Sequence, residues 1–141
     1  MATINASINI TSDIPYSGFS LSKTMTMTKA GTATGLENSN GLGVKKLAAT
    51  TAVVLELAAD ATASGANKLY IRNTGSNKAE HVKISFNASA SADTTEENIG
   101  RLYGGDWMLI PWEANGTTHN VVAAPSTADE VTTIEYMTFH E

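Results

Sequence analysis

The side chains best suited to bind a metal or move a proton are the three histidines, His81, His119 and His140. They lie far apart in the sequence, and none has a second histidine at the HxH or HxxxH spacing that places two imidazoles on one face. A sheet could bring them together, but nothing in the spacing indicates it. We therefore predict no metal site and no cofactor.

The segment from Gly105 to Pro111 resembles the opening of the second motif of the cupins, in which a glycine precedes a proline by six positions. Metal-binding cupins continue with a glycine two residues past the proline and a histidine three beyond that. This chain has Glu113 and Gly116 there, His119 comes three places late, and no HxH followed by a glutamate lies upstream. The match predicts a turn followed by a strand of a β-sandwich, not a metal cage.

Catalytic signatures of other kinds are also missing from the sequence. There is no cysteine and no GxSxG elbow to hold a nucleophile, and the glycine-rich stretch 31–43 lacks the GKS or GKT of a phosphate-binding loop. The carboxylate pairs Glu96-Glu97 and Asp129-Glu130 lie in polar stretches without the DxDxDG spacing of a calcium loop. We expect no catalytic residues and no enzymatic activity.

Length and charge limit the remaining classes. A chain of 141 residues with 42% hydrophobic residues fits a single domain, 1–141, around one core. The net charge of −5 and the scattered lysines and arginines argue against binding to nucleic acid. The start MATINASINI is no secretory signal, and no window approaches ~18 apolar residues. We expect a soluble protein that is made in a cytoplasm and does not enter a membrane.

Strict alternation of apolar and polar residues predicts two strands near the N-terminus, at 3–10 and 19–29, although Lys23 interrupts the apolar side of the second. The stretch 31–43 has no periodicity and predicts a long exposed loop. The polar, acidic stretch 87–98 predicts another.

The middle of the chain also favours strands. The segment 44–59 contains good helix formers, but its threonines and valines lead us to predict two strand-like pieces. The runs 68–74 and 80–86 both alternate, and the Gly/Asn link between them predicts a β-hairpin.

Four further strands are expected at 99–103, 107–112, 117–124 and 131–140, because turn residues separate these runs. The total is about nine or ten short strands, with turn signals at the spacing of a sandwich or barrel. We therefore predict an all-β protein, an antiparallel β-sandwich that is jelly-roll-like.

The segment RLYGGDWMLIPW (101–112) carries apolar side chains on both faces of its second strand, so both faces need cover. If the ring of Trp107 is buried, its replacement by alanine should lose roughly 3–5 kcal/mol. Alternatively, four aromatic residues form a stacking platform for sugars, namely Tyr70, Tyr103, Trp107 and Trp112. One face holds Trp107, Leu109 and Pro111, and the other holds Met108, Ile110 and Trp112.

The first strand lies at the very end of the chain, so residues 1–18 are a possible N-terminal arm or edge strand. Either it adds to a neighbouring subunit or capsid, or it pairs within its own sandwich. The candidate partner-binding residues are Ile4, Ile8, Ile10, Trp107, Trp112 and Phe139.

The C-terminal part, with LYIRNTG, VKISF, GRLYGGDWMLIPW, NVVAAPST and the closing VTTIEYMTFHE, resembles small virion structural proteins of tailed bacteriophages. The resemblance covers about 68–141 and is a pattern of strands and turns without a catalytic signature. It implies a capsid decoration or cement protein that binds the outside of a phage head, made in the host cytoplasm and located in the virion. The implied partners are the major capsid protein or another virion protein and further copies of the chain, with a trimer favoured. The alternative is a receptor- or glycan-binding module of a phage tail fibre.

Overall fold

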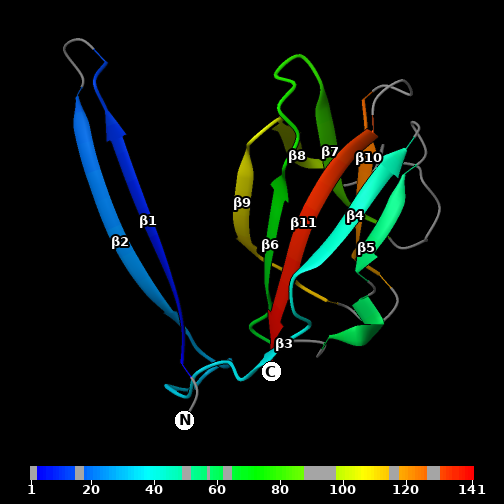
Figure 1. Ribbon diagram of the computed structural model, residues 1–141. Coiled ribbons are helices and arrows are strands. Elements are labelled where there is room, and N and C mark those ends of the chain that lie inside the picture. Colours follow the sequence, from blue (N-terminus) through cyan, green and yellow to red (C-terminus); the bar gives the residue numbers. More distant parts are fainter. Residues whose placement is uncertain are drawn as a thin grey trace.

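The computed structural model describes residues 3–14, 18–48, 52–56, 58–61, 65–87, 98–114, 118–126 and 131–141. These residues form two antiparallel sheets and a separate two-stranded hairpin that extends to one side of them (Figure 1). The part of the chain described contains eleven strands and a single 3₁₀ turn, at Ala58–Asp60, but no α-helix. The prediction of an all-β, antiparallel protein is confirmed.

The hairpin consists of β1 (Ile4–Ser12) and β2 (Phe19–Met27). In the first sheet, β3 and β4 pair with successive parts of one edge of β11, and β6 and β9 follow on its other side. The second sheet has the order β5-β10-β7-β8. The strands of the first sheet are β3 (Asn38–Ser39), β4 (Gly43–Ala48), β6 (Lys68–Asn73), β9 (Trp107–Pro111) and β11 (Val131–His140). Those of the second are β5 (Val53–Glu56), β7 (His81–Asn87), β8 (Asn98–Tyr103) and β10 (Asn120–Pro125).

The strands from β4 to β11 pair in a nested order. The first pairs with the last, β5 with β10, β6 with β9, and β7 with β8, all antiparallel. This is the pairing of one long antiparallel ribbon folded over onto itself, with β6–β11 and β7–β10 as the new contacts made by folding. The two sheets therefore face each other and share one core.

The core lies between the sheets, as the alternation along the strands requires. On β6, Leu69 and Ile71 are buried while Arg72 is exposed, and on β7 Val82 and Ile84 are buried. Every second side chain of a strand points to the same face, so these strands each contribute one apolar row to the space between the sheets. The continuous core cluster also includes Leu47, Leu55, Leu102, Trp112, Val121 and Ile134.

The predicted hairpin of 68–74 with 80–86 is wrong. β6 and β7 lie in opposite sheets, where β6 pairs with β11 and β9 while β7 pairs with β10 and β8. The connection between them crosses the edge of the sandwich, and the Asn73 side chain stabilises it by donating to the Leu102 carbonyl and accepting from the Gly75 amide. Alternation shows that one face of each strand is buried. It does not show whether the two strands pair in one sheet or lie in two sheets that face each other.

Two other expectations can be compared with the structure. The segment 44–59 forms two strands, β4 and β5, as predicted. The stretch 31–43 is not wholly an exposed loop, because Leu36 is fully buried and β3 pairs with the end of β11. The predicted loop at 87–98 lies mainly outside the described residues.

The strand β9 has the predicted division into two faces, but the two tryptophans differ. Met108 and Ile110 pack against the core, and Trp112, just beyond the strand, is 1% exposed. Trp107, on the other face, is 51% exposed. The condition for a large loss on truncation of Trp107, a buried ring, is therefore not met.

Candidate partner-binding surface

The hairpin has one apolar and one polar face. Residues directly opposite each other in an antiparallel pair point to the same side, and the register pairs Ala6 with Met25 and Ile10 with Leu21. We call this side the apolar face. Its members are Ile4, Ala6, Ile8, Ile10 and Ser12 of β1 and Phe19, Leu21, Lys23, Met25 and Met27 of β2.

The opposite side of the hairpin carries only asparagine, serine and threonine. Ser7 and Thr24 share a hydrogen bond of 2.9 Å between their hydroxyls, and the Thr26 hydroxyl donates to Asn5 Oδ1 over 2.9 Å. These cross-strand bonds fix the register. They therefore hold every apolar residue of both strands on one side, because a slip of one residue would turn it to the other.

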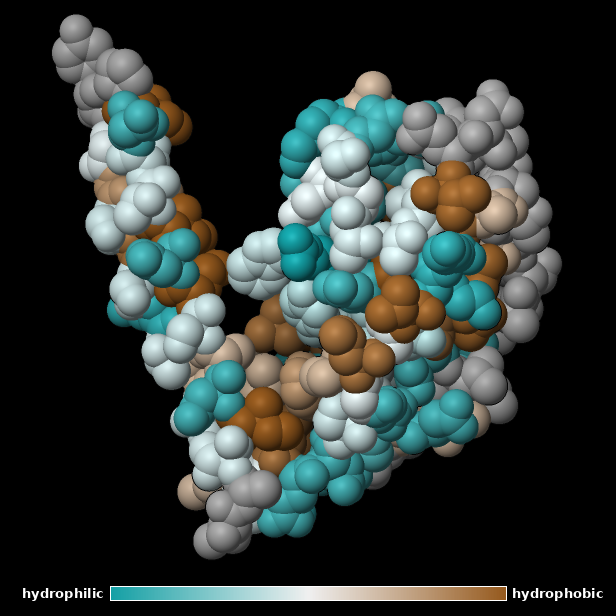
Figure 2. Space-filling model, in the orientation of Figure 1, coloured by the Kyte–Doolittle hydropathy of each residue, from teal (hydrophilic) through white to brown (hydrophobic). Residues whose placement is uncertain are grey.

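The apolar face is largely uncovered. Phe19 is 52% exposed, Met25 45% and Ile8 37%, and β1 and β2 pair only with each other. Figure 2 shows these apolar side chains along the side of the hairpin that faces the sandwich, with open space between. A lone two-stranded hairpin is marginally stable in water, and a contiguous exposed apolar patch marks an interaction site.

A groove of about 790 Å³ lies between the apolar face and the edge of the sandwich. One wall is the middle of the hairpin, and the other is the start of β9. Its lining is mainly apolar, but Lys23 contributes a cation to the hairpin wall. The lining residues are 6–11, Lys23, Met25 and 107–109.

The base of the hairpin is attached to the sandwich by buried and hydrogen-bonded residues. Met27 and Leu36 are 2% and 0% exposed, and the Leu36 amide donates to the Met27 carbonyl over 2.9 Å. A second backbone bond of 2.8 Å runs from the Lys29 amide to the Thr34 carbonyl. Both bonds lie within 27–36, so they order the turn that follows β2.

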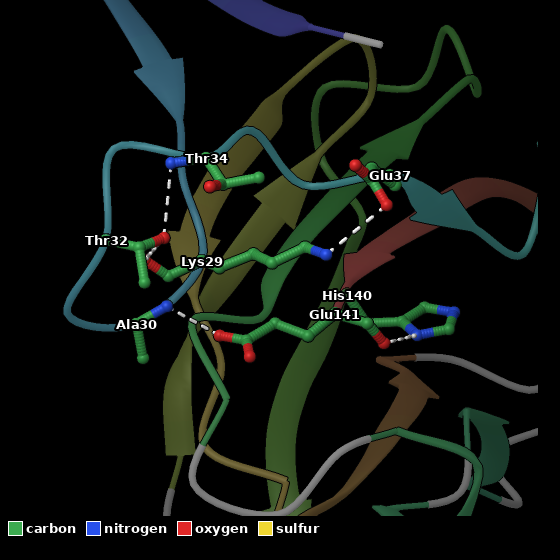
Figure 3. Close-up of polar contacts among 7 residues, drawn as sticks. All are labelled: Lys29, Ala30, Thr32, Thr34, Glu37, His140 and Glu141. Carbon is green, nitrogen blue, oxygen red and sulfur yellow. Dashed lines mark hydrogen bonds and ion pairs between the residues drawn. The ribbon is translucent and has the colours of Figure 1, made fainter. Parts of the chain in front are cut away.

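The C-terminal residue also holds this base (Figure 3). Glu141 Oε1 accepts hydrogen bonds from the Ala30 amide over 2.6 Å and from the Ala66 amide over 3.0 Å. These bonds, that from Ala30 first, hold the pKa of the Glu141 carboxyl below its ordinary value. Lys29 and Glu37 add an ion pair of 3.3 Å across the same loop. The base of the hairpin, which we also call its root, is thereby joined to the end of β11.

The second surface beside the groove is the side of the first sheet that faces away from the core. We call it the outer face. Its side chains form three cross-strand rows over β9, β6 and β11, and an ion pair of 3.9 Å joins Arg72 and Glu135 within one row. The three rows are Trp107-Arg72-Glu135, Leu109-Tyr70-Met137 and Pro111-Lys68-Phe139.

The candidate residues from the sequence divide between these surfaces. Ile4, Ile8 and Ile10 share the apolar face, and Trp107 and Phe139 belong to the outer face, two strands apart. Trp112 lies in the core, where its indole N–H donates to the His119 carbonyl over 2.9 Å. A buried ring offers no surface to a partner, so Trp112 leaves the candidate set.

Sequence reasoning did not include the second strand of the hairpin among the partner-binding residues. Phe19, Leu21 and Met25 belong to the same apolar face as Ile8 and Ile10. The signal was available, because both runs alternate and a turn separates them, so that pairing would place both apolar rows on one side. Their pairing with each other, rather than with the sandwich, is what the sequence did not reveal.

The histidines lie in separate surroundings. The His81 ring is 5.2 Å from that of Tyr103, and its pKa is lowered, first by burial and then by the charges of Arg101 and Lys83. His140 Nε2 lies 3.0 Å from Asn40 Oδ1. In the described ranges, no group of three or more histidine or acidic side chains is placed to hold a metal ion. Those ranges also hold no helix long and apolar enough to span a membrane.

Comparison with known proteins gives no relative: no family model, no curated protein and no solved structure matches the chain.

Proposed function

We propose that the chain is a capsid decoration or cement protein, which binds the outside of a phage head and stabilises it. The observation that carries this proposal is the hairpin, whose apolar face is largely exposed beside a complete sandwich. A protein that acts alone in solution gains nothing from such a surface, whereas a protein that assembles needs one. The resemblance of 68–141 to small virion structural proteins of tailed phages points to the same class.

The strand order supports the finer fold proposal of a jelly roll. Eight strands, from β4 to β11, divide into β4-β11-β6-β9 and β5-β10-β7-β8 through nested antiparallel pairs. Double-sheet jelly rolls of eight strands occur in viral capsid proteins, among other classes. The fold is compatible with the function and does not by itself establish it.

The mechanism follows from linkage. A protein that binds the assembled shell, and not its separate subunits, shifts the equilibrium toward the shell. Contacts that are weak one at a time become effective when several act together in an oligomer. The proposed partners are the major capsid protein or another virion protein, together with further copies of the chain, in a trimer.

The second candidate is a glycan-binding module of a tail fibre. A shallow depression of about 460 Å³ is lined by Tyr70, Arg72, Gly105 and Trp107. Aromatic rings pack against the apolar side of a sugar, and a guanidinium donates to its hydroxyls. The depression is open, so it favours a weakly held surface sugar over a deeply bound ligand.

The position of the protein in the particle separates the two functions. Virions of the virus that encodes the chain would be purified, the chain quantified by mass spectrometry, and its position found by electron microscopy with a labelled antibody. Decoration predicts many copies spread over the head. A few copies at the tail tip would support the glycan module instead, and absence from the virion would contradict both.

A further inference from the structure

We propose that the apolar face of the hairpin covers the outer face of the first sheet in a neighbouring copy, so that copies close into a ring by giving and receiving hairpins. This inference rests on the oligomer in the proposed function, but it does not depend on a location in a virion. Both surfaces of the proposed interface, the apolar face and the outer face, belong to this chain.

The two surfaces suit each other in shape and chemistry. Each is one side of a twisted antiparallel sheet, and such surfaces pack face to face about 10 Å apart. The hairpin presents Ile8, Ile10 and Leu21 in two adjacent rows, and the outer face presents Leu109 and Met137 on either side of Tyr70.

The chain does not cover these surfaces by itself. Both line one groove, yet Ile8 and Trp107, on its opposite walls, remain 37% and 51% exposed. The buried root around Met27 and Leu36 sets the point from which the hairpin extends beside β9, not across it. Cover for the apolar face must therefore come from another molecule.

The charge of Lys23 indicates that the apolar face packs against the outer face of another copy and not against a second hairpin. Lys23 is the one charged residue in β1 and β2, and it lies in the middle of the apolar face opposite Ile8. If two hairpins packed together by their apolar faces, both lysines would be buried without a carboxylate, which is costly. The outer face supplies one in Glu135.

Glu135 can accept a second cation. Its separation of 3.9 Å from Arg72 is long for an ion pair, and both side chains are partly open to solvent, at 28% and 47%. A lysine placed against Glu135 would complete a Lys–Glu–Arg group that has Val44 beside Glu135 on β4 and the Leu109-Tyr70-Met137 row along one side. Such a group fixes the register of the interface more than it adds affinity.

An interface between two different surfaces of the same chain is heterologous, and it forms a closed ring when the rotation between copies closes. Every copy then has its hairpin covered and its outer face occupied. Three copies joined in this way form the trimer of the proposed function.

Cross-linking tests the proposal directly, because the chain contains no cysteine and each introduced thiol is unique. Two differently tagged copies, Ile8→Cys and Leu109→Cys, would be co-expressed and treated with a short bismaleimide. We expect a covalent dimer that contains both tags. The matched control Thr24→Cys, on the polar face of the same hairpin, should give at least about tenfold less product with Leu109→Cys.

Each other result overturns the proposal. Dimers of Ile8→Cys with itself would mean that hairpins pack on hairpins. Absence of any intermolecular product, with an intramolecular product in the double variant, would mean that the hairpin closes onto its own sheet. If neither product forms and the chain cross-links only to purified capsids, the shell is the occupant.

A charge exchange tests the register. Lys23→Glu and Glu135→Lys should each weaken self-association by about tenfold or more, and their combination should restore most of it. Arg101→Gln, at an exposed position on β8 in the opposite sheet, is the control and should change the dissociation constant little. Additive losses in the double variant would contradict the proposed pairing, provided that all variants melt cooperatively.

The two proposals can fail separately. If the mixed-tag cross-link forms but virions lack the protein, the interface stands and the decoration function falls. If virions carry the protein over the head but the cross-link is absent, the function stands and this interface falls.

Discussion

Two tryptophans in one short segment have opposite surroundings. Trp112 is 1% exposed and its indole N–H is hydrogen-bonded to the His119 carbonyl, whereas Trp107 is 51% exposed and lines the groove. Successive side chains of a strand point to opposite faces, so Trp107 and Trp112, which are an odd number of residues apart, point to opposite sides of the sheet. One ring supports the fold, and the other is available to a partner.

Trp112→Ala is therefore expected to destabilise the protein by roughly 3–5 kcal/mol, because a large buried ring is lost and the partly buried His119 carbonyl loses its donor. Trp107→Ala is the matched control and, in protein dilute enough to be monomeric, should change the free energy of unfolding by less than about 1 kcal/mol. Urea denaturation followed by circular dichroism measures both. Equal losses in the two variants would show that Trp107 is also part of the core.

Glu141 gives a pH-dependent contribution at the hairpin root. Its folded-state pKa is lower than the ordinary 4.5 because the Ala30 and Ala66 amides donate to the carboxylate. The stabilisation is therefore complete above the unfolded-state pKa and is lost as the pH falls through the folded-state pKa.

At neutral pH, Glu141→Gln should melt below the unsubstituted chain, and the difference should close as the pH is lowered below the ordinary 4.5. Thermal unfolding at a series of pH values measures it. Glu113→Gln, at an exposed position outside the root, is the control and should show no such closure. A difference that is constant from neutral to acid pH would mean that the Glu141 carboxylate is not the stabilising form.

At the scale of elements, the turn between β8 and β9 shows how a connection crosses from one sheet to the other. The Asp106 amide donates to the Tyr103 carbonyl and Asp106 Oδ2 accepts from the Tyr103 amide, both over 2.9 Å. Gly105 has a φ of 88°, a backbone angle that residues other than glycine rarely adopt. Gly104 lies directly against the backbone of the connection between β6 and β7.

Gly104→Ala should be strongly destabilising, since its Cβ would lie 2.5 Å from the Asn77 carbonyl oxygen and 2.7 Å from that of Gly75. We expect a loss above about 2 kcal/mol, because two backbone segments would have to separate. Gly100→Ala, where a Cβ meets nothing within 4 Å, is the matched control and should be nearly neutral. Similar melting temperatures for the two variants would show that the crossing is loosely packed.

The elements also show what could be predicted from the sequence. Alternation located the strands well, including the separation of 44–59 into β4 and β5. It could not identify their partners, because a buried face does not reveal which sheet supplies the opposite face. For that reason β6 and β7 were assigned to one hairpin although they lie in opposite sheets.

The same limit applies to the candidate surface. Alternation reveals the apolar rows of β1 and β2, and the first row predicts Ile4, Ile8 and Ile10 as partner-binding residues. The contribution of Leu21 and Met25 depended on the pairing of the two strands, and the burial of Trp112 depended on a core formed by residues distant in the sequence. Long-range pairing is the information that periodicity lacks.

At the scale of the whole molecule, a complete sandwich carries an incompletely covered hairpin. The sandwich has its own continuous core, to which no residue of β1 or β2 belongs. The hairpin has cross-strand hydrogen bonds and an anchored base, but its apolar face, with Phe19 and Met25 about half exposed, lacks cover. In the proposed assembly, a second copy of the chain supplies this cover.

The molar mass of the particle that the unsubstituted chain forms in solution tests this proposal most directly. Light scattering at micromolar concentration should give a multimer, with three chains favoured. Leu21→Asn on the apolar face should lower the mass toward that of one chain, while Thr24→Asn on the polar face should leave it unchanged, with the sandwich folded in both. A monodisperse monomer of the unsubstituted chain at that concentration would contradict the account.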